Sequence, residues 1–295
     1  MERSDFLSDL TGGEVYLKLE NQQVTGSFKI RGALNKLLQL SEDEKARGFV
    51  TASSGNHAQG LAYASKLLGA ESTIVVPENT PKVKIEAIRK YGVNLVIYGR
   101  EYLEAEKFAR KIEKEDRKVF ISAYNDLDII AGQGTIAIEM FDENPDLNMI
   151  LVPVGGGGLI SGIASYVKNV FGCEVLGVQS ENSPVMFESL KQGKIVEIES
   201  KSSIAEALHG GIEEGSVTFE ICRRLVDEIV LVKEESIING IRLMIKTHHQ
   251  VVEGGGVVGV AALLESPERY REKSMGIVIS GGNLDEKIIK LLIGV

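Results

Sequence analysis

The sequence predicts an α/β protein built on parallel β-sheets, and two observations lead to this fold class. Short runs rich in Val and Ile alternate along the chain with segments of helical periodicity, which is typical of parallel βαβ units. Many of the 32 glycines directly follow the apolar runs, where turns from strand to helix are expected. We therefore expect buried parallel strands that bind ligands at their carboxyl ends.

The predicted strands are short runs of apolar and β-branched residues: Val15–Leu19, Phe49–Ala52, Thr73–Val76, Leu95–Tyr98, Val119–Ser122, Ile150–Val154, Val175–Val178, Ile229–Val232 and Gly276–Ser280. The predicted helices have apolar residues at helical spacing: His57–Leu68, Pro81–Tyr91, Glu101–Glu115, Leu159–Val170, Ser236–Lys246 and Glu286–Leu292. The composition shows no linker, so it does not locate a domain boundary.

The composition excludes several classes of protein. The 295 residues are 43% hydrophobic and 25% charged, which is a globular balance rather than a disordered one. A net charge of −9 disfavours nucleic acid and anionic membrane surfaces as partners, and no apolar run approaches the length of a membrane span. Cys173 and Cys222 are too few for a disulfide framework, and the segment MERSDFLSDL has no apolar core of the kind that a signal peptide requires. We expect a cytoplasmic protein that binds a small molecule.

The glycine run Gly155–Gly158 is the strongest candidate for a phosphate site. It lies between the predicted strand Ile150–Val154 and the helix Leu159–Val170, where several backbone N–H groups can converge on one anion. Neither a P-loop Lys nor G-x-G-x-x-G spacing is present in this run. That spacing does occur at Gly132–Ala137 and Gly254–Gly259, but neither segment follows a clear strand, so we favour helix packing for both.

One lysine stands out as a candidate nucleophile. Lys29 follows the turn sequence Thr25-Gly26-Ser27 and precedes an apolar helix. A lysine at a helix N-terminus with apolar neighbours has a lowered pKa, which a Schiff-base amine requires.

Four segments around these features resemble, in chain order, the signatures of the fold-type II pyridoxal-phosphate enzymes. They are TGSFKIRGA (25–33), TASSGNHAQG (51–60), VPVGGGGL (152–159) and ISGGN (279–283). Within that superfamily, which includes the tryptophan synthase beta chain, the sequence is most similar to the threonine/serine dehydratases and serine racemases.

The resemblance implies a particular architecture. It implies two open twisted parallel-sheet domains with pyridoxal 5'-phosphate between them. Residues 1–45 plus 126–295 would form the large cofactor-binding domain, and residues 46–125 the small domain that binds the substrate carboxylate. The protein would be a homodimer or a dimer of dimers acting on an amino acid.

The resemblance also implies a role for each motif residue. Lys29 would form the Schiff base with the cofactor, and Phe28 would pack on one face of its ring. The cofactor phosphate would be held by Gly155, Gly156, Gly157, Gly158 and Leu159. Asn56 would bind the ring 3-hydroxyl, Ser280 would face the ring nitrogen, and Glu253 would lie near the ring or bind loop amides. The substrate carboxylate would be bound by Ser53, Ser54, Asn56 and His57.

Other positions depart from the family pattern. Where metal-activated relatives carry two acids, this chain has Gln179 and Val185, so we expect no metal site. We expect partial burial rather than metal binding for His248 and His249. The segment Ala205–Gly211 differs from the usual Ala-Asp-Gly, which leaves the substrate preference open, and His209 could reach the substrate or cap a loop.

The resemblance implies an ammonia-lyase that converts L-threonine to 2-oxobutanoate, or L-serine to pyruvate, by deaminating β-elimination. A hydroxyl rather than a carboxylate at position 280 favours elimination, because it cannot keep the ring nitrogen protonated. The alternative enzyme is a serine racemase, in which Ser54 would be a second acid/base opposite Lys29. A non-catalytic amino-acid-binding relative is a further alternative.

Overall fold

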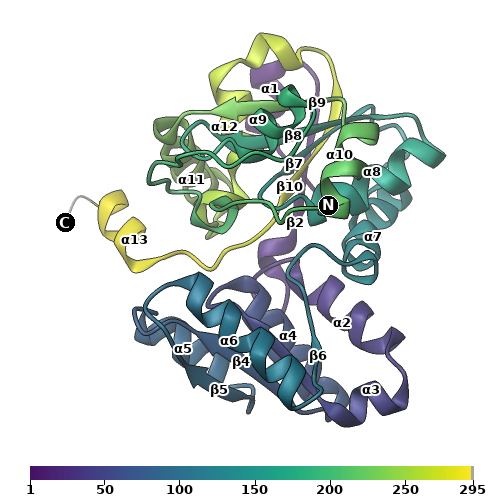
Figure 1. Ribbon diagram of the computed structural model, residues 1–295. Helices are drawn as coiled ribbons and strands as arrows, with labels where there is room; N and C mark the ends of the chain where they lie inside the picture. The colour runs from purple at the N-terminus through teal and green to yellow at the C-terminus, as the bar shows by residue number, and fades with distance from the viewer. Residues whose placement is uncertain (294–295) are drawn as a thin grey trace.

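The computed structural model describes residues 1–293, and within them ten strands form two separate sheets (Figure 1). The larger sheet has the strand order β1 (Glu2–Arg3), β2 (Glu14–Leu19), β10 (Ser274–Ile279), β7 (Met149–Pro153), β8 (Glu174–Ser180) and β9 (Glu228–Val232). It is parallel except for β1, which pairs antiparallel with β2. The smaller sheet is parallel throughout, in the order β5 (Asn94–Ile97), β4 (Ser72–Val76), β3 (Phe49–Ala52) and β6 (Val119–Phe120).

Helices cover both faces of the larger sheet. Since successive residues of a strand point to opposite faces, each central strand contributes side chains to two apolar cores. Leu151 of β7 packs into one apolar core, whereas Ile150 and Val152 pack into another. The first core contains residues of α1 (Asp5–Thr11), α11 (Glu234–His248) and α12 (Val258–Glu265). The second contains residues of α7 (Leu127–Glu143), α8 (Gly158–Val170), α9 (Val185–Gln192) and α10 (Val217–Leu225).

The smaller sheet is covered in the same way. Its helices are α2 (Lys29–Gln39), α3 (Glu42–Arg47), α4 (Asn56–Leu68), α5 (Lys82–Arg89) and α6 (Tyr102–Glu115). Phe49 of β3 packs with α2 and α4, whereas Val50 packs with α6 on the other face. The short 3-10 helices are η1 (Glu20–Gln22), η2 (Glu206–Leu208), η3 (Gly254–Gly256) and η4 (Pro267–Tyr270), and the last helix is α13 (Glu286–Ile293).

The predicted α/β class with two parallel sheets is confirmed, and every predicted strand is present within two residues of its expected bounds. Strand β6 ends at Phe120 rather than Ser122, because the Ser122 hydroxyl accepts hydrogen bonds from the amides of Tyr124 and Asn125 and so turns the chain. The two-residue strand β1 was not predicted, since it is too short to show alternation. The division into domains at residues 45 and 125 stays a prediction.

The glycines of Gly132–Ala137 pack helices together, as predicted. A Cβ on Gly132 would lie 2.6 Å from the Cα of Gly32 in α2, and a Cβ on Gly134 would lie 2.9 Å from the carbonyl oxygen of Gly162 in α8. Helix α7 therefore contacts both α2 and α8 at backbone distance, which holds the starts of these two helices in a defined relation. No helix within residues 1–293 is both long and apolar enough to cross a membrane.

Candidate active site

The segments that follow strands of the two sheets meet at one place. Asn56 follows β3 and contacts Asn283, which follows β10. Tyr124 follows β6 and lies against Gly156, which follows β7. Since the carboxyl ends of parallel strands form the ligand-binding edge of a sheet, the candidate site lies between the carboxyl ends of both sheets.

Lys29 is the first residue of α2, as the sequence predicted, and its side chain is partly buried at this edge. Its Nζ donates a hydrogen bond to the carbonyl oxygen of Ala123 at 2.7 Å and lies 5.2 Å from the centre of the Phe28 ring. Desolvation lowers the pKa of Lys29 to about 8, although the nearby Glu253 raises it. About a tenth of this amine is therefore unprotonated at pH 7, far more than for an exposed lysine, and the unprotonated form is the one that acts as a nucleophile.

Arg31 holds the first turn of α2 in place. Its guanidinium donates two hydrogen bonds to the carboxylate of Glu20, at 2.7 and 2.8 Å, and two to that of Glu139, both at 2.6 Å. A fifth bond of 3.0 Å goes to the hydroxyl of Thr135, so all five donors of the side chain are used. Because Glu20 follows β2 and Glu139 belongs to α7, Arg31 fixes Lys29 relative to the larger sheet.

His57 is buried beside Lys29, with 4% of its surface exposed. Its Nε2 lies 3.1 Å from the carbonyl oxygen of Ile121. Burial, and then the charge of Lys29, lower the pKa of His57 to about 3, so the imidazole is neutral at physiological pH. Because the carbonyl oxygen can only accept, Nε2 carries the single proton of the neutral ring, and Nδ1 can act only as an acceptor.

Glu253, Asn56 and Asn283 form a hydrogen-bonded chain across the site. The side-chain amide of Asn56 donates to Glu253 Oε1 at 2.7 Å, and that of Asn283 donates to Asn56 Oδ1 at 2.6 Å. Burial raises the pKa of Glu253 to about 7, although the hydrogen bond from the Asn56 side chain and one from the backbone amide of Asn283 lower it. Glu253 thus does bind loop amides, and it also acts electrostatically on Lys29.

The glycine run Gly155–Gly158 forms the entry to α8. Gly157 is the N-cap residue with φ 88°, a left-handed conformation that favours glycine, and no side chain within residues 1–293 caps this helix. The ring of Tyr124 lies so close that a Cβ on Gly156 would come within 2.7 Å of it. The uncapped helix N-terminus, which continues into the buried Leu159, presents backbone donors and a positive dipole suited to an anion.

The other predicted site residues lie around the same edge. Ser280 is buried, and its carbonyl oxygen accepts a hydrogen bond from the amide of Phe28 at 3.1 Å. Ser53 and Ser54 are half-buried in the turn between β3 and α4. The hydroxyl of Ser53 accepts a hydrogen bond from the amide of Gly55 at 3.3 Å.

These residues fit pyridoxal phosphate. The site combines an amine of lowered pKa, an uncapped helix N-terminus and a buried hydroxyl, which match the aldehyde, the phosphate and the ring nitrogen of the cofactor. The hydroxyl of Ser27, next to Phe28, is buried without a hydrogen-bond partner among the described residues.

Sequence reasoning missed Tyr124 and its neighbours. The hydroxyl of Tyr124 accepts a hydrogen bond from the amide of Glu213 at 2.9 Å, and the side chain of Asn125 donates to Glu213 Oε2 at 2.8 Å. Thr218 donates to the carbonyl oxygen of Gly156 at 2.6 Å. Tyr124 was detectable in principle, because it comes just after Ala123 in the turn that follows the predicted strand Val119–Ser122.

The positions that depart from the family pattern have structural roles. Gln179 is buried, and its Oε1 accepts a hydrogen bond from the amide of Phe187 at 2.9 Å. His248 is partly buried as predicted, between Glu2 at 2.6 Å and Ser4 at 2.9 Å, whereas His249 is exposed. Within residues 1–293 no group of three or more His, Cys, Asp or Glu side chains is arranged to hold a metal ion. His209 is exposed in the loop after η2.

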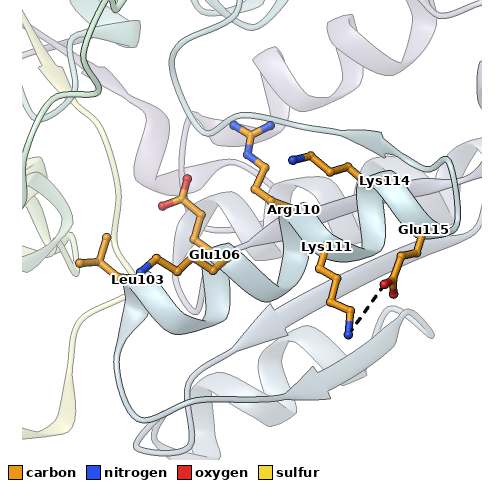
Figure 2. A pocket seen from close by; sticks show the side chains of 7 residues that line it. Leu103, Glu106, Arg110, Lys111, Lys114 and Glu115 are labelled. Atoms are coloured by element: carbon orange, nitrogen blue, oxygen red, sulfur yellow. Dashed lines mark ion pairs between the residues drawn. The ribbon is translucent and has the colours of Figure 1, made fainter.

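A hollow of about 630 Å³ lies elsewhere, along one face of α6. Its seven lining residues all belong to this helix, and Figure 2 shows Lys111 turned toward Glu115, with which it forms an ion pair of 3.8 Å. Because none of these residues follows the end of a strand, we do not assign the hollow to the site.

Comparisons with known proteins agree with this geometry. A curated L-threonine ammonia-lyase of Thermotoga maritima is 45% identical over 291 residues, which are 98% of this chain and 72% of that protein. The structure of the processed form of threonine deaminase isoform 2 from Solanum lycopersicum superposes with a TM-score of 0.95 at 33% identity, covering 100% of this chain and 86% of that one. The structure of maize serine racemase superposes with a TM-score of 0.93 at 32% identity, covering 99% and 90%.

The family model described as pyridoxal-phosphate dependent enzyme matches residues 1–281, which confirms both the predicted resemblance and the predicted cofactor. With a match over nearly the whole length and relatives above 30% identity, the chain belongs to the family of pyridoxal-phosphate dependent enzymes.

Proposed function

We propose that the protein is an ammonia-lyase that eliminates water from L-threonine or L-serine and releases ammonia and a 2-oxo acid. The observation that carries the proposal is the juxtaposition of two features. The Lys29 amine, whose pKa is lowered to about 8, donates to Ala123, and the ring of the next residue, Tyr124, lies against the glycine run at the start of α8. A nucleophilic amine and an anion-binding helix N-terminus therefore lie close together at the carboxyl ends of the strands.

Each predicted residue has a place in this proposal. Lys29 would hold the cofactor and move the α-proton of the substrate, and Phe28 would pack beside the ring. The phosphate would be held by backbone donors of Gly155, Gly156, Gly157, Gly158 and Leu159. Bound pyridoxal phosphate supplies the electron sink that makes the α-proton of an amino acid acidic.

The remaining residues orient the cofactor ring and the substrate. Ser280 would bind at the ring nitrogen, and Asn56, which donates a hydrogen bond to Glu253, would bind the ring hydroxyl. Ser53, Ser54, Asn56 and His57 receive the substrate carboxylate at the N-terminus of α4, where the helix dipole favours a negative charge. A neutral His57 suits this arrangement, because its pKa of about 3 keeps a second charge away from Lys29.

A serine racemase is the second candidate, and the half-buried Ser54 at the turn before α4 favours it, since a second acid/base is required on the face opposite Lys29. The cytoplasmic location and the assembly as a homodimer or dimer of dimers stay predictions.

The test uses the protein purified with pyridoxal phosphate. We expect a yellow protein that loses its colour on borohydride reduction with the cofactor fixed on Lys29, and ammonia release from L-threonine or L-serine that the variant Lys29→Ala lacks. Chiral analysis of serine after incubation separates elimination from racemisation. A colourless protein, or one that binds amino acids without turnover, would support the non-catalytic alternative instead.

A further inference from the structure

A lysine outside the site connects the two sheets beside it. Lys84 lies in the first turn of α5, next to the smaller sheet. Its Nζ forms ion pairs of 3.4 Å with Glu206 of η2 and of 3.4 Å with Asp285, just before α13. In Figure 1 the chain from β10 to α13 passes between the two sheets, close to α5. The single charge of Lys84, beside the smaller sheet, is thus shared by two acids, Glu206 and Asp285, whose segments pack with the larger sheet.

Both segments contact residues of the candidate site. Leu208 of η2 lies against the glycine run, because a Cβ on Gly155 would come within 3.1 Å of its Cα, and it also lies against Gly255. Asp285 comes two residues after Asn283, which bonds to Asn56. The two acids that Lys84 binds therefore belong to segments that contact different residues of the same site.

The charges in this region are coupled. Burial raises the pKa of Glu253, and among the surrounding charges Lys84 lowers that pKa while Glu206 raises it. The Asp285 side chain is 15% exposed, that of Lys84 29% and that of Glu206 51%, so water screens the ion pair with Asp285 less than the one with Glu206. In the loop that follows η2, a Cβ on Gly210 or Gly211 would meet nothing within 4 Å, so this part of the chain has open space beside it.

We propose that Lys84 is a positioning residue that holds η2 and the segment Asn283–Asp285 over the substrate site, so that tight substrate binding depends on its charge. This inference rests on the proposed function, because it takes the region beside Lys29 as the place where the amino acid binds. Lys84 touches neither Lys29 nor the glycine run in any hydrogen bond or ion pair within residues 1–293, so its effect is on binding rather than on the chemical step.

The test compares the holoenzyme variants Lys84→Met, Lys84→Arg and Lys82→Met. Lys82 is the matched control, because it lies in the same turn, is exposed and has no ion pair among the described residues. Lys84→Met should raise the KM for L-threonine by about three- to tenfold, the range that two partly exposed ion pairs give, with kcat within about twofold. Lys84→Arg should restore KM, and Lys82→Met should leave it unchanged.

Hydrogen exchange provides a readout that does not require activity. The amides of Leu208 and His209 donate to the carbonyl oxygens of Ala205 and Glu206, and they should exchange faster in Lys84→Met but not in Lys82→Met. Unchanged exchange, an unchanged KM, or a failure of Lys84→Arg to restore KM would each overturn the proposal. If the wild-type protein releases no ammonia from any hydroxy amino acid, the proposed function fails, and the exchange measurement alone decides the role of Lys84.

Discussion

Replacing Lys29 by methionine should make the cofactor-free protein more stable, although it removes the proposed catalytic amine. The pKa of Lys29 falls from 10.5 to about 8 on folding, mainly because the amine loses contact with water. A shift of this size corresponds to about 3 kcal/mol at pH 7. The lost hydrogen bond to Ala123 offsets about 1 kcal/mol. We therefore expect Lys29→Met to raise the free energy of unfolding by about 2 kcal/mol.

The pH dependence of this gain has a defined sign. Below pH 8 both the folded and the unfolded chain carry a protonated Lys29, and the folded chain bears the full penalty of burying the charge. Between pH 8 and 10.5 the folded chain alone loses the proton, so the penalty shrinks as the pH rises. At pH 9.5 it should have fallen to about 1.4 kcal/mol.

Urea unfolding of the cofactor-free protein, followed by circular dichroism at pH 7 and pH 9.5, measures both effects. The control is Lys111→Met, whose side chain is 59% exposed and which should change stability by no more than about 0.5 kcal/mol. The reasoning would be refuted if Lys29→Met were no more stable than the wild type at pH 7, or if its advantage did not shrink by pH 9.5.

As the pH rises from 4.5 to about 7, the carboxyl of Glu253 ionises in the unfolded chain but not yet in the folded one, so the cofactor-free wild type should lose about 3 kcal/mol of stability. Glu253→Gln should not show this loss. Equal pH dependence of urea unfolding in both proteins would contradict this. Arg31→Lys should destabilise the protein by about 2–3 kcal/mol, because the buried Glu20, 1% exposed, loses its two hydrogen bonds from one guanidinium. An unchanged thermal unfolding temperature would contradict this role of Arg31. Ser54→Ala should leave elimination from the L-amino acids within about tenfold and abolish racemisation or D-serine elimination; a loss of several orders of magnitude with L-substrates would favour a two-base enzyme.

Local pattern was sufficient to locate nine of the ten described strands, about half of the described helices and the chemistry-bearing motifs. The strands β3 and β7 appear in the sequence as apolar runs because both of their faces are buried. The glycine run before α8 and the place of Lys29 at the start of α2 are equally local, since a turn and a helix start depend on a few adjacent residues. These features, taken with the order of four motifs, were enough to predict the fold class, the family and the cofactor.

The tertiary structure decided which of these residues act on one another. Strand order cannot be read from periodicity, and the placement of β10 between β2 and β7 is what brings Asn283 to Asn56. The pKa of Lys29 depends on burial and on the charge of Glu253, and that of Glu253 on burial and on its hydrogen bond with Asn56, all of which exist only after the chain has folded. Lys84 is an ordinary charge in its helix, and its partner Glu206 lies 122 residues away. Local backbone conformation depends on steric preferences of adjacent residues, whereas electrostatic and hydrogen-bond partners depend on how distant segments of the chain pack.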